Sequence, residues 1–138
     1  MIVQQLEKKS SDSLQQAYRY YSILSALNNL NLTEREIQLI AFMAVKGSIS
    51  IMTNKEAFCE LYGSSFPTIN NIVSKLKQLK IFVKDNKDII VNPLISLDFT
   101  KDVVLQIKLV NDYGYTGQTI EHASKGVVDK EAESEIVS

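Results

Sequence analysis

The sequence predicts a mainly α-helical fold with one small antiparallel β-hairpin, which places the chain in the α+β class. Thr33 and Glu36 form a capping-box pattern in front of an almost uninterrupted apolar run that ends at Val45. Residues 65–80 carry apolar side chains at the spacing of one helix face. Two short β-branched runs then flank the polar residues 85–88, which have the composition of a hairpin turn.

A first helix is predicted from Ser11 or Ser13, either of which can cap it, to about Asn29. Its expected buried stripe consists of Leu14, Ala17, Tyr18, Tyr21, Leu24 and Leu27. Tyrosines at positions 18, 20 and 21 cannot all face one core, so this helix should pack against two neighbours. We expect residues 1–31 to form an N-terminal helix, for which a second subunit is one candidate neighbour.

The helix at 34–46 should be the most buried one, because polar residues hardly interrupt it. Gly47 should end it, since glycine adopts the left-handed C′ conformation at little cost. Residues 48–51 alternate between serine and isoleucine, which predicts a short third strand.

A short helix over 54–62 is predicted from a second capping-box pattern, Thr53 to Glu56, and Gly63 should end it. The helix at 65–80 follows, with Ser64 or Ser65 as its cap and Pro67 in its first turn. Two helices joined by about three residues form a helix-turn-helix arrangement. The apolar stripe of the second helix is Ile69, Ile72, Val73, Leu76 and Leu79.

The other side of this second helix is polar and has no acidic residue. Its members are Thr68, Asn71, Lys75 and Gln78, with Asn70, Ser74 and Lys77 beside them. Asn and Gln pair bidentately with adenine, Ser and Thr bond bases or phosphates, and lysines hold the phosphate backbone. An ordinary solvated helix face is the alternative, although such faces usually mix acids with bases. The pattern favours contact with DNA.

The order of elements and the Gly63-Ser64-Ser65 turn resemble winged helix-turn-helix domains, in particular those of plasmid and phage replication proteins and of MarR-type regulators. The resemblance covers about residues 32–95 and implies a recognition helix near 65–76 and a wing at 81–92. This chain differs from the usual form in having no arginine in the recognition segment and two aspartates in a short wing turn. The expected DNA-binding residues are Ser64, Ser65, Thr68, Asn70, Asn71, Ser74, Lys75, Lys77, Gln78, Lys80, Lys84 and Lys87. For the two hairpin lysines, Lys84 and Lys87, the alternative is protection of a sheet edge from pairing with other chains.

The chain after the hairpin follows a different pattern. Residues 96–111 should supply an additional strand, because Val103, Leu105, Ile107 and Leu109 alternate over 103–109. Its partner is either a sheet edge or a second subunit. Residues 112–138 form an acidic stretch without apolar periodicity, which we expect to be flexible and to be available to a protein partner.

Composition limits how the chain can bind nucleic acid. It has 138 residues, 45% of them hydrophobic, and a net charge of −1. This near-neutral total excludes a protein that coats nucleic acid by charge alone. The charge is nevertheless uneven, with four lysines and no acid from Thr68 to Lys84, and six acids against two lysines from Val110 onward. A local basic surface is consistent with docking on phosphates.

Nothing in the sequence predicts catalysis, a cofactor or a metal site. Cys59 is the single cysteine and His122 the single histidine, so a disulfide and a Cys/His metal cluster are both excluded within the chain. The pattern around Cys59 favours an inert, packed thiol. Without a secretory segment or a long apolar run, we expect an intracellular protein, which includes the cytoplasm of a bacterium that is producing phage.

The sequence therefore predicts a non-enzymatic protein that binds double-stranded DNA sequence-specifically, as a homodimer. Two roles remain open, a transcriptional regulator or an accessory protein of phage or plasmid replication or packaging. The alternative from another class is a protein–protein interaction module, for example in a phage particle or its assembly.

Overall fold

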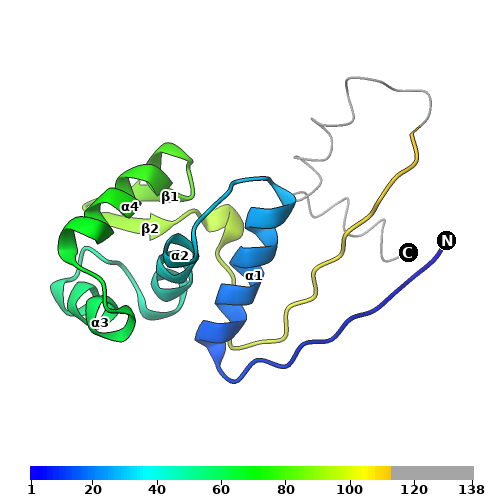
Figure 1. The fold of residues 1–138 in the computed structure, drawn as a ribbon, viewed down its shortest axis with the longest axis horizontal. Helices are drawn as coiled ribbons and strands as arrows, with labels where there is room; N and C mark the ends of the chain where they lie inside the picture. Colours follow the sequence, from blue (N-terminus) through cyan, green and yellow to red (C-terminus); the bar gives the residue numbers. More distant parts are fainter. Residues whose placement is uncertain (113–138) are drawn as a thin grey trace. The chain divides into compact units, whose positions relative to one another are not determined.

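The computed structural model describes residues 1–112 of the chain, and it divides them between two units. Residues 1–101 form one compact unit that contains every described helix and strand. The elements are α1 (Ser13–Leu27), α2 (Glu34–Lys46), α3 (Met52–Tyr62), α4 (Phe66–Gln78), β1 (Phe82–Asp85), β2 (Asp88–Val91) and the short 3-10 helix η1 (Pro93–Ile95). Four helices and a two-stranded antiparallel sheet confirm the α+β class (Figure 1). Most of the acidic stretch, with His122, lies outside the described residues.

Helix α2 is the centre of this unit, as the sequence predicts. Its buried residues are Glu36, Ile37, Leu39, Ile40, Ala41, Phe42 and Met43, and α1, α3 and β2 all contact it. The capping box is confirmed: the Thr33 Oγ1 accepts from the Glu36 N–H at 3.2 Å, and the Glu36 Oε1 accepts from the Thr33 N–H at 2.8 Å. Gly47 ends the helix with a φ of 110°.

Helix α1 packs against two neighbours, and both belong to this chain. One is α2, and the other is the segment after β2 (Figure 1). The Tyr21 hydroxyl donates to the Ile95 carbonyl at 2.7 Å, and the Tyr20 and Phe99 ring centroids lie 5.5 Å apart. Burial, together with the nearby Tyr20, raises the pKa of Tyr21. The tyrosines thus do not require a second subunit, and the helix is capped by Asp12 rather than by a serine.

The third strand expected at Ser48–Ile51 is absent, and the sheet has two strands among the described residues. The segment forms a turn, in which the Ser48 hydroxyl accepts from the Ser50 N–H and the Ser48 carbonyl accepts from the Ile51 N–H. The Asn54 side chain also donates to that carbonyl, at 3.0 Å. Local hydrogen bonds therefore satisfy the backbone groups that a strand ladder would need.

The expected capping box at Thr53 is also wrong. Helix α3 begins earlier, at Met52, with Ile51 at its N-cap and no side-chain cap. Asn54 lies inside the helix, where its amide bonds to the preceding turn at Ser48. Phe58 is the buried residue of this helix.

Three helices end in the same type of C-terminal turn. In each, a backbone N–H donates to the carbonyl five residues earlier: Leu30 to Ser25, Ser64 to Cys59 and Ile81 to Leu76. The left-handed positions in these turns are Asn29, Gly63 and Lys80, with φ values of 53°, 64° and 65°. Gly63 confirms the predicted end of α3, whereas Lys80 occupies a conformation that glycine usually takes.

The additional strand expected within 96–111 is not present in the described residues. Pro93–Ile95 forms η1, and residues 102–112 of the second unit have no regular secondary structure. Several of their apolar side chains are exposed, including Val104, Leu109 and Val110. The apolar residues thus alternate in the sequence over 103–109, but this segment does not pair as a strand within the described residues.

Candidate nucleic-acid interface

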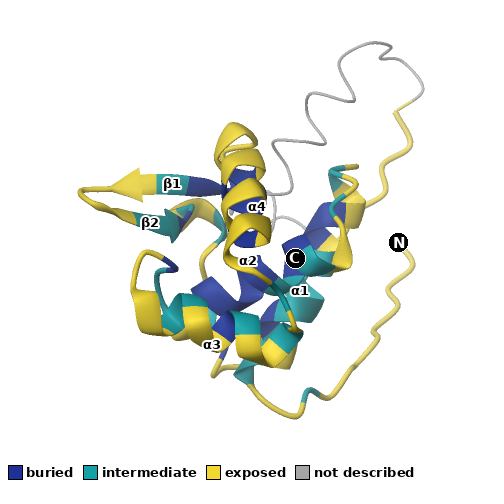
Figure 2. Cartoon of the chain, turned by 60° about the vertical axis from the view of Figure 1, so that its left-hand side comes forward, coloured by how far each residue is buried: buried dark blue, intermediate teal, exposed yellow. Residues whose placement is uncertain are grey.

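Helix α4 has one buried and one exposed side. Ile69, Ile72, Val73 and Leu76 are buried, which confirms all of the predicted stripe except Leu79, the C-cap, which is 42% exposed. The polar residues of the helix lie at exposed positions, as Figure 2 shows along α4. The sequence-predicted division of this helix into an apolar and a polar side is therefore correct.

The N-terminal end of α4 is fixed by Ser65, one of the two predicted caps. The Ser65 Oγ accepts from the Thr68 N–H at 3.4 Å and lies 2.9 Å from the Thr68 Oγ1. Pro67 occupies the first turn, where it needs no hydrogen-bond acceptor. The Ser64 Oγ, in contrast, is buried without a hydrogen-bond partner in the described part of the chain. Ser64 therefore does not offer its hydroxyl to a ligand on this surface.

Four polar side chains on the exposed side of α4 are unengaged. Within residues 1–112, the side chains of Asn71, Ser74, Lys77 and Gln78 make no hydrogen bond or ion pair. Exposed amide, hydroxyl and ammonium groups without internal partners can exchange water for a ligand without breaking the fold. These four are the expected site residues that the structure leaves most available.

Lys75 differs from the other lysines because it is held within the fold. Its Nζ donates to the Glu36 Oε1 at 2.9 Å, and the two side chains are 44% and 9% exposed. Burial alone would raise the pKa of Glu36, but the Thr33 amide and the Lys75 ammonium together lower it. The ion pair joins α4 to α2. Lys75 thus stabilises the packing of α4 on α2, a role that the sequence alone did not predict.

A cation that the sequence analysis missed lies beside the N-terminal end of α4. Lys55 of α3 places its Nζ 3.4 Å from the Asn70 Oδ1 and 5.3 Å from the centroid of the Phe66 ring. In the sequence, Lys55 is an ordinary surface lysine of a short helix, 15 residues from Asn70. Only the crossing of α3 and α4 brings it to this surface.

The hairpin is attached to the C-terminal end of α4. The Asn92 side chain donates to the Lys80 carbonyl at 2.9 Å, and the Asn92 N–H donates to the Ile81 carbonyl at 2.8 Å. Phe82 pairs with Val91 at the base of the sheet, where both are buried. Asn86 at the tip has a φ of 57°, a conformation that asparagine tolerates.

The lysines near this junction are all exposed. They comprise Lys77 and Lys80 at the end of α4, and Lys84 and Lys87 on the hairpin. Asp85 and Asp88 lie on the same hairpin and are also exposed, so the tip is mixed in charge rather than uniformly basic. The lysines at the end of α4 and those on the hairpin therefore lie in neighbouring segments of the chain. Only the hairpin lysines have exposed acidic residues beside them.

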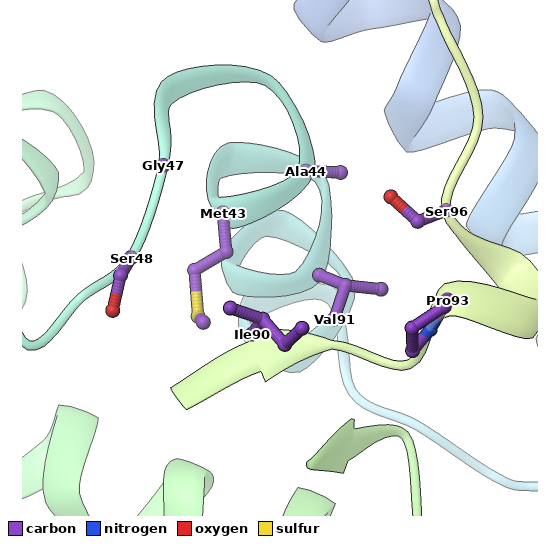
Figure 3. Close-up of a pocket in the computed structure, with 8 residues that line it drawn as sticks. All are labelled: Met43, Ala44, Gly47, Ser48, Ile90, Val91, Pro93 and Ser96. Carbon is purple, nitrogen blue, oxygen red and sulfur yellow. The ribbon is translucent and has the colours of Figure 1, made fainter. Parts of the chain in front are cut away.

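A hollow of about 450 Å³ lies between the end of α2, β2 and η1. Figure 3 shows Met43, Ile90 and Val91 among the side chains that line it. None of its lining residues is charged. No group of His, Cys, Asp or Glu side chains within residues 1–112 is arranged to hold a metal ion. The exposed side of α4, in contrast, presents lysines, amides and hydroxyls that a ligand could bind.

Comparison of the chain with family models, curated proteins and solved structures finds no significant match. Among the described helices, none combines the length and the apolar character needed to cross a membrane.

Proposed function

We propose that this protein is a winged-helix protein that binds double-stranded DNA, with α4 in the major groove and the β1–β2 hairpin as the wing. One observation carries the proposal. Helix α4 contains no acidic residue, and its exposed side presents amides, hydroxyls and lysines. Four of these side chains, those of Asn71, Ser74, Lys77 and Gln78, have no hydrogen-bond or ion-pair partner in the described chain. An ordinary solvated helix would be expected to mix acids with bases on this side.

The chemistry of the surface supports such docking. The major groove admits one α-helix, and in helix-turn-helix docking the N-terminal residues of the second helix face the base edges. Thr68, Asn70 and Asn71 lie at that end of α4. The preceding helix crosses the backbone in this geometry, which gives Lys55 of α3 a phosphate to contact.

We propose a contact set that differs from the expected one at Ser64, Lys75 and Lys55. We assign base contacts to Thr68, Asn70 and Asn71, and contacts to either bases or backbone to Ser65, Ser74 and Gln78. The phosphate contacts are Lys55, Lys77, Lys80, Lys84 and Lys87. Ser64 is omitted because its hydroxyl is buried, and Lys75 because Glu36 holds it.

Two roles follow from DNA binding without catalysis: regulation of transcription, or marking of a site for replication or packaging machinery of a phage or plasmid. A protein–protein interaction module is the second candidate function. The exposed aspartates of the hairpin, the absence of arginine from α4 and the net charge of −1 favour that second candidate.

Titration of duplex DNA at several salt concentrations separates the two candidates. A DNA-binding protein should lose affinity with salt, with a slope of about −0.9 in log K against log [salt] for each phosphate contact. The five lysines assigned above predict a slope of roughly −4 to −5. A slope near zero, with no binding beyond a weak non-specific level, would contradict DNA binding and support the interaction module.

We further propose that the functional form is a homodimer, because residues 102–112 expose four apolar side chains, those of Val104, Ile107, Leu109 and Val110. Light scattering over a range of concentrations tests this. A mass near twice 15.5 kDa is expected. A monomer at all concentrations would remove the dimer, and with it any operator composed of two half-sites.

A further inference from the structure

The first two turns of α4 present a restricted set of chemical groups. Phe66 is 36% exposed at the first helical position, and Thr68, Asn70 and Asn71 are exposed after it. The nearest lysine of the same helix, Lys75, is held by Glu36. The N-terminal part of the helix therefore offers amides, a hydroxyl with its methyl group and an aromatic ring, but no unengaged cation of its own.

Lys55 is the cation from another helix that reaches this end, and it has two contacts there. Its ammonium lies near the Asn70 amide oxygen and over the Phe66 ring. Both contacts keep the ammonium at the rim of the helix start. Asn70 thus shares its amide oxygen, whereas Asn71 has both amide groups available.

These groups match one type of base pair better than the other. Guanine presents two acceptors in the major groove and is read chiefly by the paired donors of Arg or by Lys. Adenine presents one acceptor and one donor, which suit the amide of Asn, and thymine presents a methyl group, which suits apolar contacts from Phe or the Thr methyl. The exposed start of α4 supplies the groups that suit adenine and thymine: an Asn amide, the Thr68 methyl group and the Phe66 ring.

We infer that α4 reads A·T base pairs through the major groove. In this arrangement the Asn71 amide bonds to adenine N6 and N7, and Phe66 and the Thr68 methyl pack against thymine methyl groups. Lys55 and the lysines near the hairpin hold the flanking phosphates without selecting bases. This inference rests on the proposed DNA binding, and it adds the base pair that is recognised.

Selection from a random duplex pool, with the full chain as bait, provides the first test. Enriched sites should share a core of A·T pairs. Two modified versions of a selected site then separate groove readout from DNA shape. Replacing adenine by 7-deazaadenine removes the N7 acceptor, and replacing thymine by uracil removes the methyl group, while both leave the minor-groove edge unchanged.

With the unmodified protein, 7-deazaadenine at the critical position should weaken binding about 2- to 10-fold, which corresponds to one lost hydrogen bond. Asn71→Ala should abolish this sensitivity, so that the variant binds both duplexes equally. Lys77→Gln is the matched control: it should weaken binding to both duplexes while it retains the sensitivity to 7-deazaadenine. Thermal unfolding of each variant confirms that it folds.

The outcomes distinguish the inference from the function on which it rests. If no duplex is bound above the non-specific level, the proposed DNA binding fails and the inference with it. If duplexes are bound but the enriched sites are G·C-rich or have no common core, DNA binding stands and the A·T inference is wrong. Enrichment of A·T sites that is insensitive to both 7-deazaadenine and uracil would also overturn the inference, because it would indicate recognition by shape.

Discussion

Helices α2 and α4 have the same length, 13 residues, but the fold uses them in opposite ways. Seven residues of α2 are buried, which include the carboxylate-bearing Glu36. Four residues of α4 are buried, all of them apolar, and its polar residues lie at exposed positions (Figure 2). One helix thus forms the centre of the core, while the other rests on the core and keeps its polar side exposed.

The difference in burial between α2 and α4 predicts that folding stability and DNA binding depend on separate residues. Substitutions in α2 should act on the free energy of unfolding, and substitutions on the outer side of α4 should act on DNA binding. The ion pair between Glu36 and Lys75 is where the two helices are coupled, so a change there should affect folding although Lys75 lies on the polar side of α4.

The largest effect is expected in α2. Leu39→Ala should lower the free energy of unfolding by about 2–5 kcal/mol, because Leu39 is fully buried and its removal leaves a cavity. Urea denaturation measures this loss. Ser74→Ala, on the exposed side of α4, is the matched control and should change stability by less than about 0.5 kcal/mol. Similar losses at both positions would abolish the distinction between the two helices.

The second effect concerns binding by α4. Asn71→Ala should reduce discrimination at one base pair by about 1–3 kcal/mol, and it should leave the free energy of unfolding nearly unchanged because the side chain has no partner in the described chain. Competition between the preferred duplex and a duplex altered at that position measures the change. Unchanged discrimination would place the base readout elsewhere.

The third effect is on stability, at the junction of the two helices. Lys75→Gln should cost roughly 1–2 kcal/mol, between the values for an exposed pair and for a hydrogen bond to a buried charge. This is a loss that Lys77→Gln should not show. A stability loss at Lys77 as large as that at Lys75 would mean that the ion pair is not what distinguishes them.

The same ion pair should depend on pH. The folded-state pKa of Glu36 is lowered from its ordinary 4.5, so its contribution is fully present above pH 4.5 and is lost as the pH falls through the lower folded-state value. Glu36→Gln should therefore flatten the acid side of the stability profile. Unfolding measured from neutral to acidic pH tests this, and equal slopes for wild type and Glu36→Gln would contradict it.

The smallest effect is expected where α4 ends. Lys80→Gly should raise stability by up to about 1 kcal/mol, because glycine adopts the left-handed conformation of this residue without strain. Lys80→Ala removes the same charge but keeps the strain, so it should lack this gain. Thermal unfolding compares the two variants, and equal stabilities would show that the backbone conformation at Lys80 is not strained.

Local patterns in the sequence were sufficient where the interacting residues are close in the chain. The capping box of Thr33 and Glu36, the apolar stripe of α4 and the turn at Gly63 each depend on residues within one or two helical turns. The failure at residues 48–51 also has a local cause: the Ser48 and Asn54 side chains form hydrogen bonds with the backbone of a segment that alternates like a strand.

Contacts between distant residues could not be predicted. Glu36 and Lys75 are separated by 39 residues, and Tyr21 and Ile95 by 74. Lys55 reaches α4 only because of how two helices cross. The polar side of α4 was therefore predictable from the sequence. That Lys75 is held by Glu36, and that Lys55 reaches this surface, could be learned only from the structure.

We propose that the surface formed by α4 and the hairpin binds the phosphate backbone. The most direct test compares two triple variants with the same change in charge. In one, Lys77, Lys84 and Lys87 become Gln; in the other, the exposed Lys8, Lys9 and Lys101 become Gln. The account predicts that the first variant weakens binding to all duplexes and lowers the salt slope by roughly three, and that the second leaves the slope nearly unchanged. Equal slopes for the two variants, with both proteins folded, would contradict it.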